Sequence, residues 1–212
     1  MISTECEWIT KRLNGLSKLS ILDIGGGTHY SRLRAQSWIG YELYKPLLSQ
    51  GNRIDVFEKK LVYRKKDIVF SVPLEFLSRC IHFSTRLRRA FSSFLPLART
   101  VFGDCQKISL RDESYDVVFL LSVLEHVLNP EQTLAEAARV LKSDGQAFVS
   151  IPEICPYHAA PIDTGLRMPP DELARFASAS FTILDKASVC DQVGTRVSIL
   201  HVRKNKVVNG SL

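Results

Sequence analysis

The chain has 212 residues, 45% hydrophobic and 24% charged, which suits one globular domain and is too short for two domains of ordinary size. Its five cysteines are widely spaced and never form C-x-x-C pairs, so neither a disulfide framework nor a metal site is expected, and a cytoplasmic protein is favoured. The sequence has no signal-peptide pattern and no apolar stretch near the roughly 20 residues that a membrane-spanning helix needs.

The first part of the chain predicts a helix, a buried strand and a glycine turn. Residues 5–16 carry apolar side chains at helical spacing, and Ile21–Ile24 form a short apolar run with one carboxylate, Asp23. Three glycines follow this run at once: Gly25, Gly26 and Gly27. Glycine allows a tight turn there and lets a ligand approach the bare backbone.

A second strand is expected over Trp38–Glu42, ending in the carboxylate of Glu42. An acid at the end of the strand that follows a glycine turn can accept hydrogen bonds from both hydroxyls of a ribose. The glycine turn and Glu42 therefore predict a nucleoside site at the carboxyl edge of a parallel sheet. The alternative for Glu42 is an ordinary exposed acid.

Positive charge is concentrated in one segment. Residues 45–103 hold twelve Lys and Arg and four acids, a net charge of +8 in a chain whose total is +6. We therefore expect a single domain over residues 1–212 with a basic helical insert at about 45–100.

Within the insert, residues 74–95 have apolar side chains at helical spacing with arginines mostly off that line, which predicts a basic amphipathic helix. One interpretation is a lid helix with solvated arginines. The other is a surface for an anionic partner, such as a phosphorylated substrate or an acidic membrane face. Nucleic acid is not expected, because aromatic residues do not alternate with the basic ones.

The second half alternates predicted strands and helices. Asn129 is a predicted helix cap, with Pro130 at the first helical position. The expected strands are 100–102, 115–121, 146–151, 181–188 and 196–202, and the expected helices are 129–141 and 172–179. This alternation predicts an α/β fold with an open, doubly wound, mostly parallel sheet.

Four ordered segments, ILDIGGGTHY, GDCQKISLRDESYDVVFLLSVLEHV, AEAARVLKSDG and FVSIP, resemble the motifs of class I S-adenosylmethionine-dependent methyltransferases, in particular the small-molecule subgroup. The resemblance runs in pieces from residue 21 to 202 and does not cover the insert. It implies a Rossmann-like seven-stranded sheet with an antiparallel last strand and S-adenosylmethionine across the strand tips. It also implies methyl transfer to an oxygen or nitrogen of a small substrate, such as an anionic molecule, a sugar, a lipid or a natural product.

The resemblance implies roles for nine cofactor-binding residues. Asp23 would lie near the cationic end of the cofactor, where an anion is favourable, and Glu42 would hold the ribose. Asp104 would accept from the adenine amino group, unless it is only a turn residue. The complete set is Asp23, Gly25, Gly26, Gly27, Glu42, Asp104, Cys105, Leu121 and Ser122, the Cys105 amide donating to the adenine ring and the last two offering backbone carbonyls to the ammonium.

Two histidines are candidates for catalysis. His158 would contact substrate or act as general base, since an imidazole is mostly neutral at cytosolic pH. His126 would be a base, a cap or a packing contact. Tyr157, Asp163 and Arg167 would contact substrate, although the last two would equally well pair with each other to pin their loop.

Two further interpretations stay open. His29 replaces a glycine of the family pattern, which would suit a non-catalytic methyltransferase-like binding protein. A nicotinamide-dependent oxidoreductase is disfavoured, because Tyr30 stands where the dinucleotide fingerprint needs its last glycine. The oligomeric state is not predicted.

Overall fold

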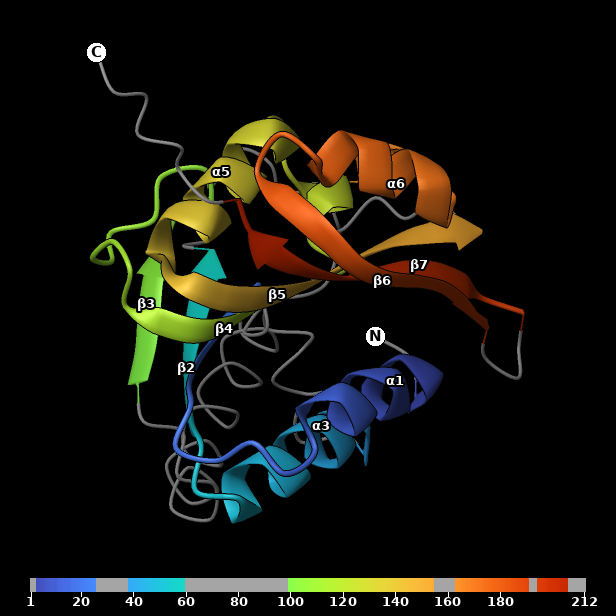
Figure 1. The fold of residues 1–212 in the computed structure, drawn as a ribbon. Coiled ribbons are helices and arrows are strands. Elements are labelled where there is room, and N and C mark those ends of the chain that lie inside the picture. The colour runs from blue at the N-terminus through green and yellow to red at the C-terminus, as the bar shows by residue number, and fades with distance from the viewer. Residues whose placement is uncertain (1–2, 26–37, 60–98, 155–162, 191–193, 206–212) are drawn as a thin grey trace, which may run out of the picture.

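The computed structural model describes residues 3–25, 38–59, 99–154, 163–190 and 194–205, which build one seven-stranded sheet (Figure 1). Its strands are β1 Ser20–Ile24, β2 Arg53–Lys59, β3 Arg99–Gly103, β4 Tyr115–Leu121, β5 Leu141–Ile154, β6 Phe181–Cys190 and β7 Arg196–Lys204. The helices described are α1 Ser3–Leu13, α3 Trp38–Ser49, the 3-10 turn η1 Leu124–His126, α5 Pro130–Val140 and α6 Pro170–Ala177.

The strand order is β3-β2-β1-β4-β5-β7-β6. Neighbouring strands are parallel from β3 to β5, and β7 runs antiparallel to both β5 and β6. The prediction of a mostly parallel seven-stranded sheet with an antiparallel last strand is therefore confirmed.

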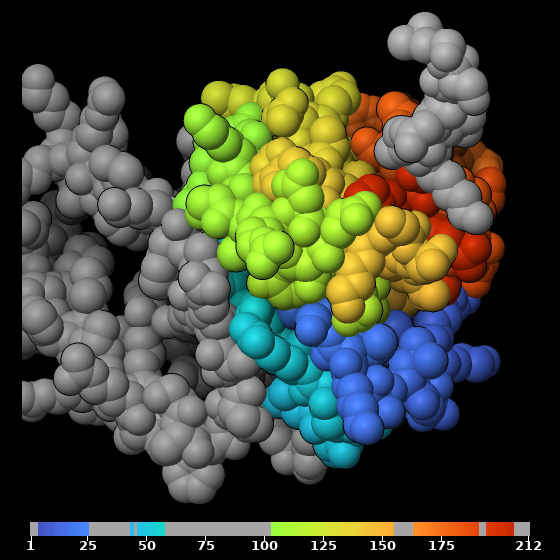
Figure 2. Space-filling model, turned by 60° about the vertical axis from the view of Figure 1, so that its left-hand side comes forward, coloured from blue at the N-terminus to red at the C-terminus, as the bar shows by residue number. Residues whose placement is uncertain are grey.

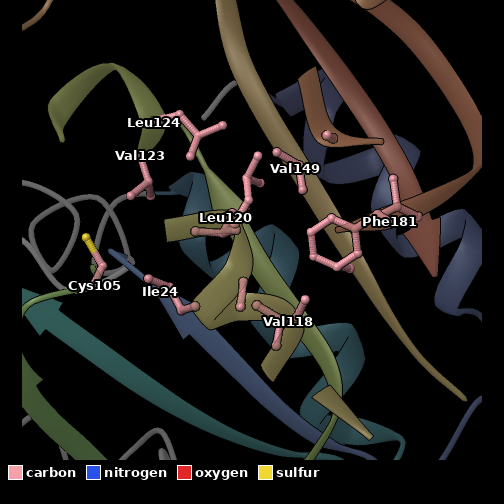
Figure 3. Close-up of a cluster of buried hydrophobic side chains, with 14 of the residues drawn as sticks. Ile24, Cys105, Val118, Leu120, Val123, Leu124, Val149 and Phe181 are labelled. Atoms are coloured by element: carbon pink, nitrogen blue, oxygen red, sulfur yellow. The ribbon is translucent and has the colours of Figure 1, made fainter. Parts of the chain in front are cut away.

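Helices cover both faces of the sheet, α1 and α3 on one side and α5 and α6 on the other (Figure 1). Figure 3 shows part of the core under α5 and α6, where Val118, Leu120, Val149 and Phe181 pack together. In the space-filling view, the blue and cyan N-terminal segments pack directly against the green residues that follow β3 (Figure 2). In the described ranges, no helix has the length and apolar character needed to cross a membrane.

Residues 38–42, predicted as a strand, are instead the first part of helix α3. The reason is the apolar spacing further along: Leu43, Tyr44 and Leu47 share one face of the helix and are buried, and α3 packs against α1. The strand beside β1 is β2, which begins after Gly51 turns the chain and pairs in parallel from Ser20↔Arg53 onward.

Part of the segment predicted as a basic insert belongs to the sheet. Both β2 and β3 are strands of it, with Asp55↔Arg99 as their first pair. Residues 74–95 lie outside the described residues, and their basic amphipathic helix stays a prediction.

The predictions for the second half agree with the structure more closely. Strand β4 has the predicted bounds, and the Asn129 side chain accepts from the Gln132 amide at 2.9 Å, which caps α5 as expected. Strand β5 is longer than the predicted 146–151 at both ends. It begins at Leu141, which pairs with Tyr115 of β4, and its pairing with β7 continues past Pro152, which lies opposite Val197.

Helix α1 is anchored to the C-terminal part of the chain. Arg12 forms an ion pair with Asp185 of β6, and the Thr4 hydroxyl donates to the Cys190 carbonyl at 3.3 Å. Trp8 lies edge-on to Phe148 of β5, with ring centroids 6.1 Å apart. The position of α1 therefore depends on residues more than a hundred positions away in sequence.

Arg139 of α5 fixes the loop that follows β3. Its guanidinium donates to the Ile108 and Leu110 carbonyls at 2.6 and 2.9 Å, and it pairs with Glu136, which accepts from the Ile108 amide at 2.7 Å. Nearby, the Asn129 amide donates to the Gln106 side chain at 2.9 Å. The loop after β3 is thereby held against the start of α5.

The helical assignment of α3 gives a direct test. Leu47 is almost fully buried, whereas the adjacent Leu48 is only partly buried. We expect Leu47→Ala to lower the free energy of unfolding by about 2–5 kcal/mol and Leu48→Ala by clearly less. Urea denaturation of the two variants measures both values, and equal losses would contradict the packing of α3 described here.

Candidate functional site

The carboxyl edge of the sheet has a switch point between β1 and β4. From β1 the strand order runs to β2 and β3 on one side, and from β4 it runs to β5 on the other, so the order reverses between β1 and β4. In open α/β sheets, ligands bind at such a point, outside the carboxyl ends of the strands. The predicted residues Asp23, Gly25, Leu121 and Ser122 all lie at these two strand ends.

Gly25 occupies a position that its surroundings reserve for glycine. Its φ is +81°, and its amide donates to the Phe57 carbonyl of β2 at 2.8 Å. A Cβ atom there would lie 2.6 Å from Cγ2 of Val123. Only glycine fits at this position, because neighbouring segments approach its backbone closely. Gly26 and Gly27 lie outside the described residues.

Asp23 is buried, with 1% of its surface exposed, and accepts a hydrogen bond from the Tyr44 hydroxyl of α3. Burial raises the pKa of Asp23 to about 7, an effect that the Tyr44 hydrogen bond opposes and the nearby Glu5 carboxyl strengthens. A cation bound nearby would favour the ionised carboxylate. The role of Asp23 at the cationic end of a ligand stays a prediction.

The end of β4 is a sharp turn at Ser122, whose φ of +53° is unusual for a residue other than glycine. Its amide donates to the Ser150 carbonyl at 3.2 Å and the Ser150 hydroxyl at 3.1 Å, so β5 holds the turn in place. The turn directs the chain from β4 into η1.

The turn η1 carries Glu125 and His126. Glu125 is buried, and burial raises the pKa of its carboxyl to about 7. Its backbone carbonyl accepts from the Thr164 amide at 2.8 Å and hydroxyl at 3.1 Å. The His126 side chain is 21% exposed, with Nε2 3.7 Å from the Glu125 carboxylate. His126 therefore lies shortly after the end of β4 and is partly exposed, and its catalytic role stays a prediction.

Asp104 and Cys105 follow β3 at the same edge. One carboxylate oxygen of Asp104 accepts from the Gln106 amide at 2.9 Å and from its side chain at 3.2 Å, so this residue does stabilise its own turn. Cys105 is buried and lies near Ile24 and Val123 (Figure 3). Contact with an adenine ring stays a prediction for both.

Asp163 and Arg167, the predicted substrate residues, pair with each other. The guanidinium binds the two carboxylate oxygens at 3.1 and 2.7 Å, and the Asp163 side chain is fully buried. The interpretation that the pair pins its loop agrees with this geometry, and Thr164 joins the loop to Glu125. Tyr157 and His158 lie outside the described residues.

Glu42 does not occupy the position on which its predicted role depended. It lies within α3 and not at the end of the strand beside β1. The acid near the end of that strand is Glu58, opposite Phe102 in β3 and one residue after Phe57, which pairs with Ile24. The expected ribose contact therefore has its positional equivalent in Glu58.

Sequence analysis missed Glu58 and also the buried neighbours Glu5 and Tyr44. The segment Gly51-Asn52 followed by Arg-Ile-Asp-Val-Phe-Glu has the turn and strand pattern of β2 and could have identified Glu58. The roles of Glu5 and Tyr44 depend on how α1 and α3 pack, which no local pattern encodes.

A model of the family described as "Methyltransferase domain" matches residues 22–149. The chain is 25% identical over 152 residues to the mitochondrial 2-methoxy-6-polyprenyl-1,4-benzoquinol methylase of Xenopus laevis, a match covering 66% of this chain and 47% of that protein. The chain thus spans less than half the length of this curated relative.

Two of the solved structures that share the fold are a methyltransferase and a cyclase. One is the 1,6-didemethyltoxoflavin-N1-methyltransferase of Burkholderia thailandensis with bound 1,6-didemethyltoxoflavin and S-adenosylhomocysteine, with a TM-score of 0.64 and 16% identity, covering 96% of this chain and 77% of that one. The other is the [4+2]-cyclase SpnF, with a TM-score of 0.58 and 18% identity, covering 96% and 81%.

The packing at Gly25 gives a prediction with a matched control. Gly15 has nearly the same φ, +80°, but a Cβ there would meet nothing within 4 Å. We expect Gly15→Ala to cost about 1–2 kcal/mol for its left-handed backbone alone. Gly25→Ala should cost about 1–3 kcal/mol more, because Val123 must also move. Urea denaturation compares the two, and similar losses would refute the close contact at Gly25.

The buried carboxyls predict a pH dependence of stability. The pKa of Glu125 is about 7 in the folded protein and near 4.5 in the unfolded chain, so its contribution is complete below about pH 4.5 and is lost as pH rises through 7. Glu125→Gln removes this dependence. The free energy of unfolding of Glu125→Gln, measured relative to that of wild type, should therefore rise by about 3 kcal/mol between pH 5 and pH 8.

Urea denaturation across this pH range measures that difference, and Asp23→Asn should change it in the same direction. Glu131→Gln, an exposed acid on α5, is the control and should follow wild type. A constant difference between Glu125→Gln and wild type would show that the Glu125 carboxyl titrates normally.

Proposed function

Because the chain belongs to the methyltransferase domain family and has the class I fold, we propose that it binds S-adenosylmethionine and transfers its methyl group to an oxygen or nitrogen of a small molecule. One observation carries the proposal. The bare backbone of Gly25 and the buried acid Asp23 lie together at the switch point between β1 and β4, where a nucleoside with a cationic end would bind.

The residues that would hold the methyl donor follow from their positions. Asp23 would favour its cationic end, and Gly25, with Gly26 and Gly27, would allow its close approach to the backbone. We place the ribose contact on Glu58 in preference to Glu42, since Glu58 is near the end of the strand beside β1.

The adenine would lie toward the loop after β3. Cys105 is already packed against the core there, and Asp104 is exposed at the start of the same loop. The carbonyls of Leu121 and Ser122 would face the other end of the donor, at the turn that closes β4.

When bound, the donor supplies an activated methyl group on a sulfonium with a good leaving group. The protein then has to align the acceptor atom with that methyl group and keep water out. The partly exposed His126 would contact the acceptor or take its proton, and we retain His158 for the same role. The Asp163–Arg167 pair would hold its own loop in position and would not contact the substrate.

The acceptor is proposed to be a small organic molecule, as the printed names of the Xenopus and Burkholderia proteins suggest for those proteins. Residues 74–95 would add a contact to an anionic group of the acceptor or to an acidic membrane face. Membership of the methyltransferase domain family argues against the alternative of a nicotinamide-dependent oxidoreductase. The fold shared with a [4+2]-cyclase, however, means that architecture alone does not choose the reaction, so methyl transfer requires its own assay.

The ribose assignment can be tested with two glutamates that sequence alone does not separate. We expect Glu58→Gln to weaken S-adenosylhomocysteine binding at least tenfold, since it removes the charge from hydrogen bonds worth about 1.5–3 kcal/mol each. Glu42→Gln should bind within about twofold of wild type. Calorimetric titration measures both.

Three other results would count against the proposals. A larger loss for Glu42→Gln would overturn the Glu58 assignment. Absence of binding by wild type would overturn donor binding itself. Binding without methyl transfer to any of a broad panel of small-molecule acceptors would support the non-catalytic alternative.

A further inference from the structure

Glu125 has a buried carboxylate oxygen that its own surroundings leave unsatisfied. Only 2% of its side chain is exposed, and within the part of the chain that the structure describes, Oε2 has no hydrogen-bond partner. The other oxygen, Oε1, is 3.7 Å from Nε2 of His126, which is too far for a hydrogen bond. Burying an acid in this way is costly, and native proteins normally satisfy such groups.

The position of Glu125 is fixed by its backbone. The amide and the hydroxyl of Thr164 both donate to the Glu125 carbonyl, and the Asp163–Arg167 pair holds the loop that contains Thr164. Val123, two residues before Glu125, contacts the position of Gly25 at the tip of β1. The carboxyl group is therefore held beside the strand ends where the methyl donor is proposed to bind.

Two more buried acids lie in the same region. Asp23 is at the tip of β1, and Glu5, with none of its surface exposed, comes from α1. The Glu5 carboxyl raises the pKa of both Asp23 and Glu125, so it is near enough to act on each. The largest opposing influences are the Tyr44 hydroxyl at Asp23 and, at Glu125, a hydrogen bond from its own backbone, followed by the Arg167 guanidinium, which is already paired with Asp163. The charge of the N-terminus also lowers the pKa of both carboxyls.

We propose that Glu125 binds the ammonium group at the amino-acid end of the methyl donor, through the oxygen that lacks a partner. The inference rests on the proposed donor binding and adds a residue to it. What Oε2 lacks is a hydrogen-bond donor, and an ammonium supplies three N–H groups. The sulfonium has no hydrogen to donate, so it cannot satisfy this atom.

The neighbouring groups fit the same ligand end. The carbonyls at the end of β4 precede Glu125 by three and four residues and would accept the remaining ammonium protons. Asp23 and Glu5 make the surroundings favourable for a cation. The three acids come from α1, β1 and η1. An ammonium bound among them would therefore link elements on both sides of the switch point.

The test compares two ligands that differ only in the ammonium. One is S-adenosylhomocysteine, and the other is its analogue in which hydrogen replaces the α-amino group. We expect wild type to bind the first at least tenfold more tightly. Glu125→Gln should lose most of that preference, with a five- to twentyfold weaker affinity for S-adenosylhomocysteine and an affinity for the deaminated analogue within about twofold of wild type. Glu131→Gln should behave as wild type.

Equal weakening of both ligands by Glu125→Gln, or no weakening, would overturn the inference while leaving donor binding intact. Absence of S-adenosylhomocysteine binding by wild type would instead overturn the proposed function. Glu125→Asp serves as a second variant because it keeps the charge but withdraws it by one methylene. It should show an intermediate loss confined to S-adenosylhomocysteine, and it decides the question if the glutamine variant does not fold.

Discussion

The site depends on the close approach of three backbone segments around Gly25. The end of β1, the neighbouring β2 and the chain leaving β4 meet there, with a hydrogen bond from Gly25 to Phe57 on one side and Val123 against its α-carbon on the other. No side chain fits between them. The same contact that closes the core at this point keeps the main chain bare, so packing and ligand access have one common cause.

Burying the acids around this contact lowers the stability of the unliganded protein. Asp23 and Glu125 are both buried, and burial favours their protonated forms. A protein selected only for stability would have apolar side chains at these positions. Their presence is understandable if a cation completes the region, so stability of the free protein is lower in exchange for affinity.

Most of the fold was predictable where local chemistry decides structure. The run Tyr115–Leu121 is mostly apolar and includes two β-branched valines, and Asn129 with Pro130 marks a helix start, so both elements have the expected positions. Trp38–Glu42 misled because a five-residue apolar run does not distinguish strand from helix, and Pro46 obscured the helical spacing beyond it. The surroundings of Glu125 include Thr164, which lies 39 residues later in the chain, and no local sequence pattern reveals that contact.

The tethering of α1 to β6 affects how the molecule assembles during synthesis. Thr4 meets Cys190 and Arg12 meets Asp185, contacts separated by 186 and 173 residues. Helix α1 leaves the ribosome before the strands of the sheet, yet its packing surface is completed only after β6 and β7 emerge. Glu5 therefore reaches its place late, and a nascent chain that lacks β6 and β7 would have β1 and β4 without α1 fixed beside their acidic residues.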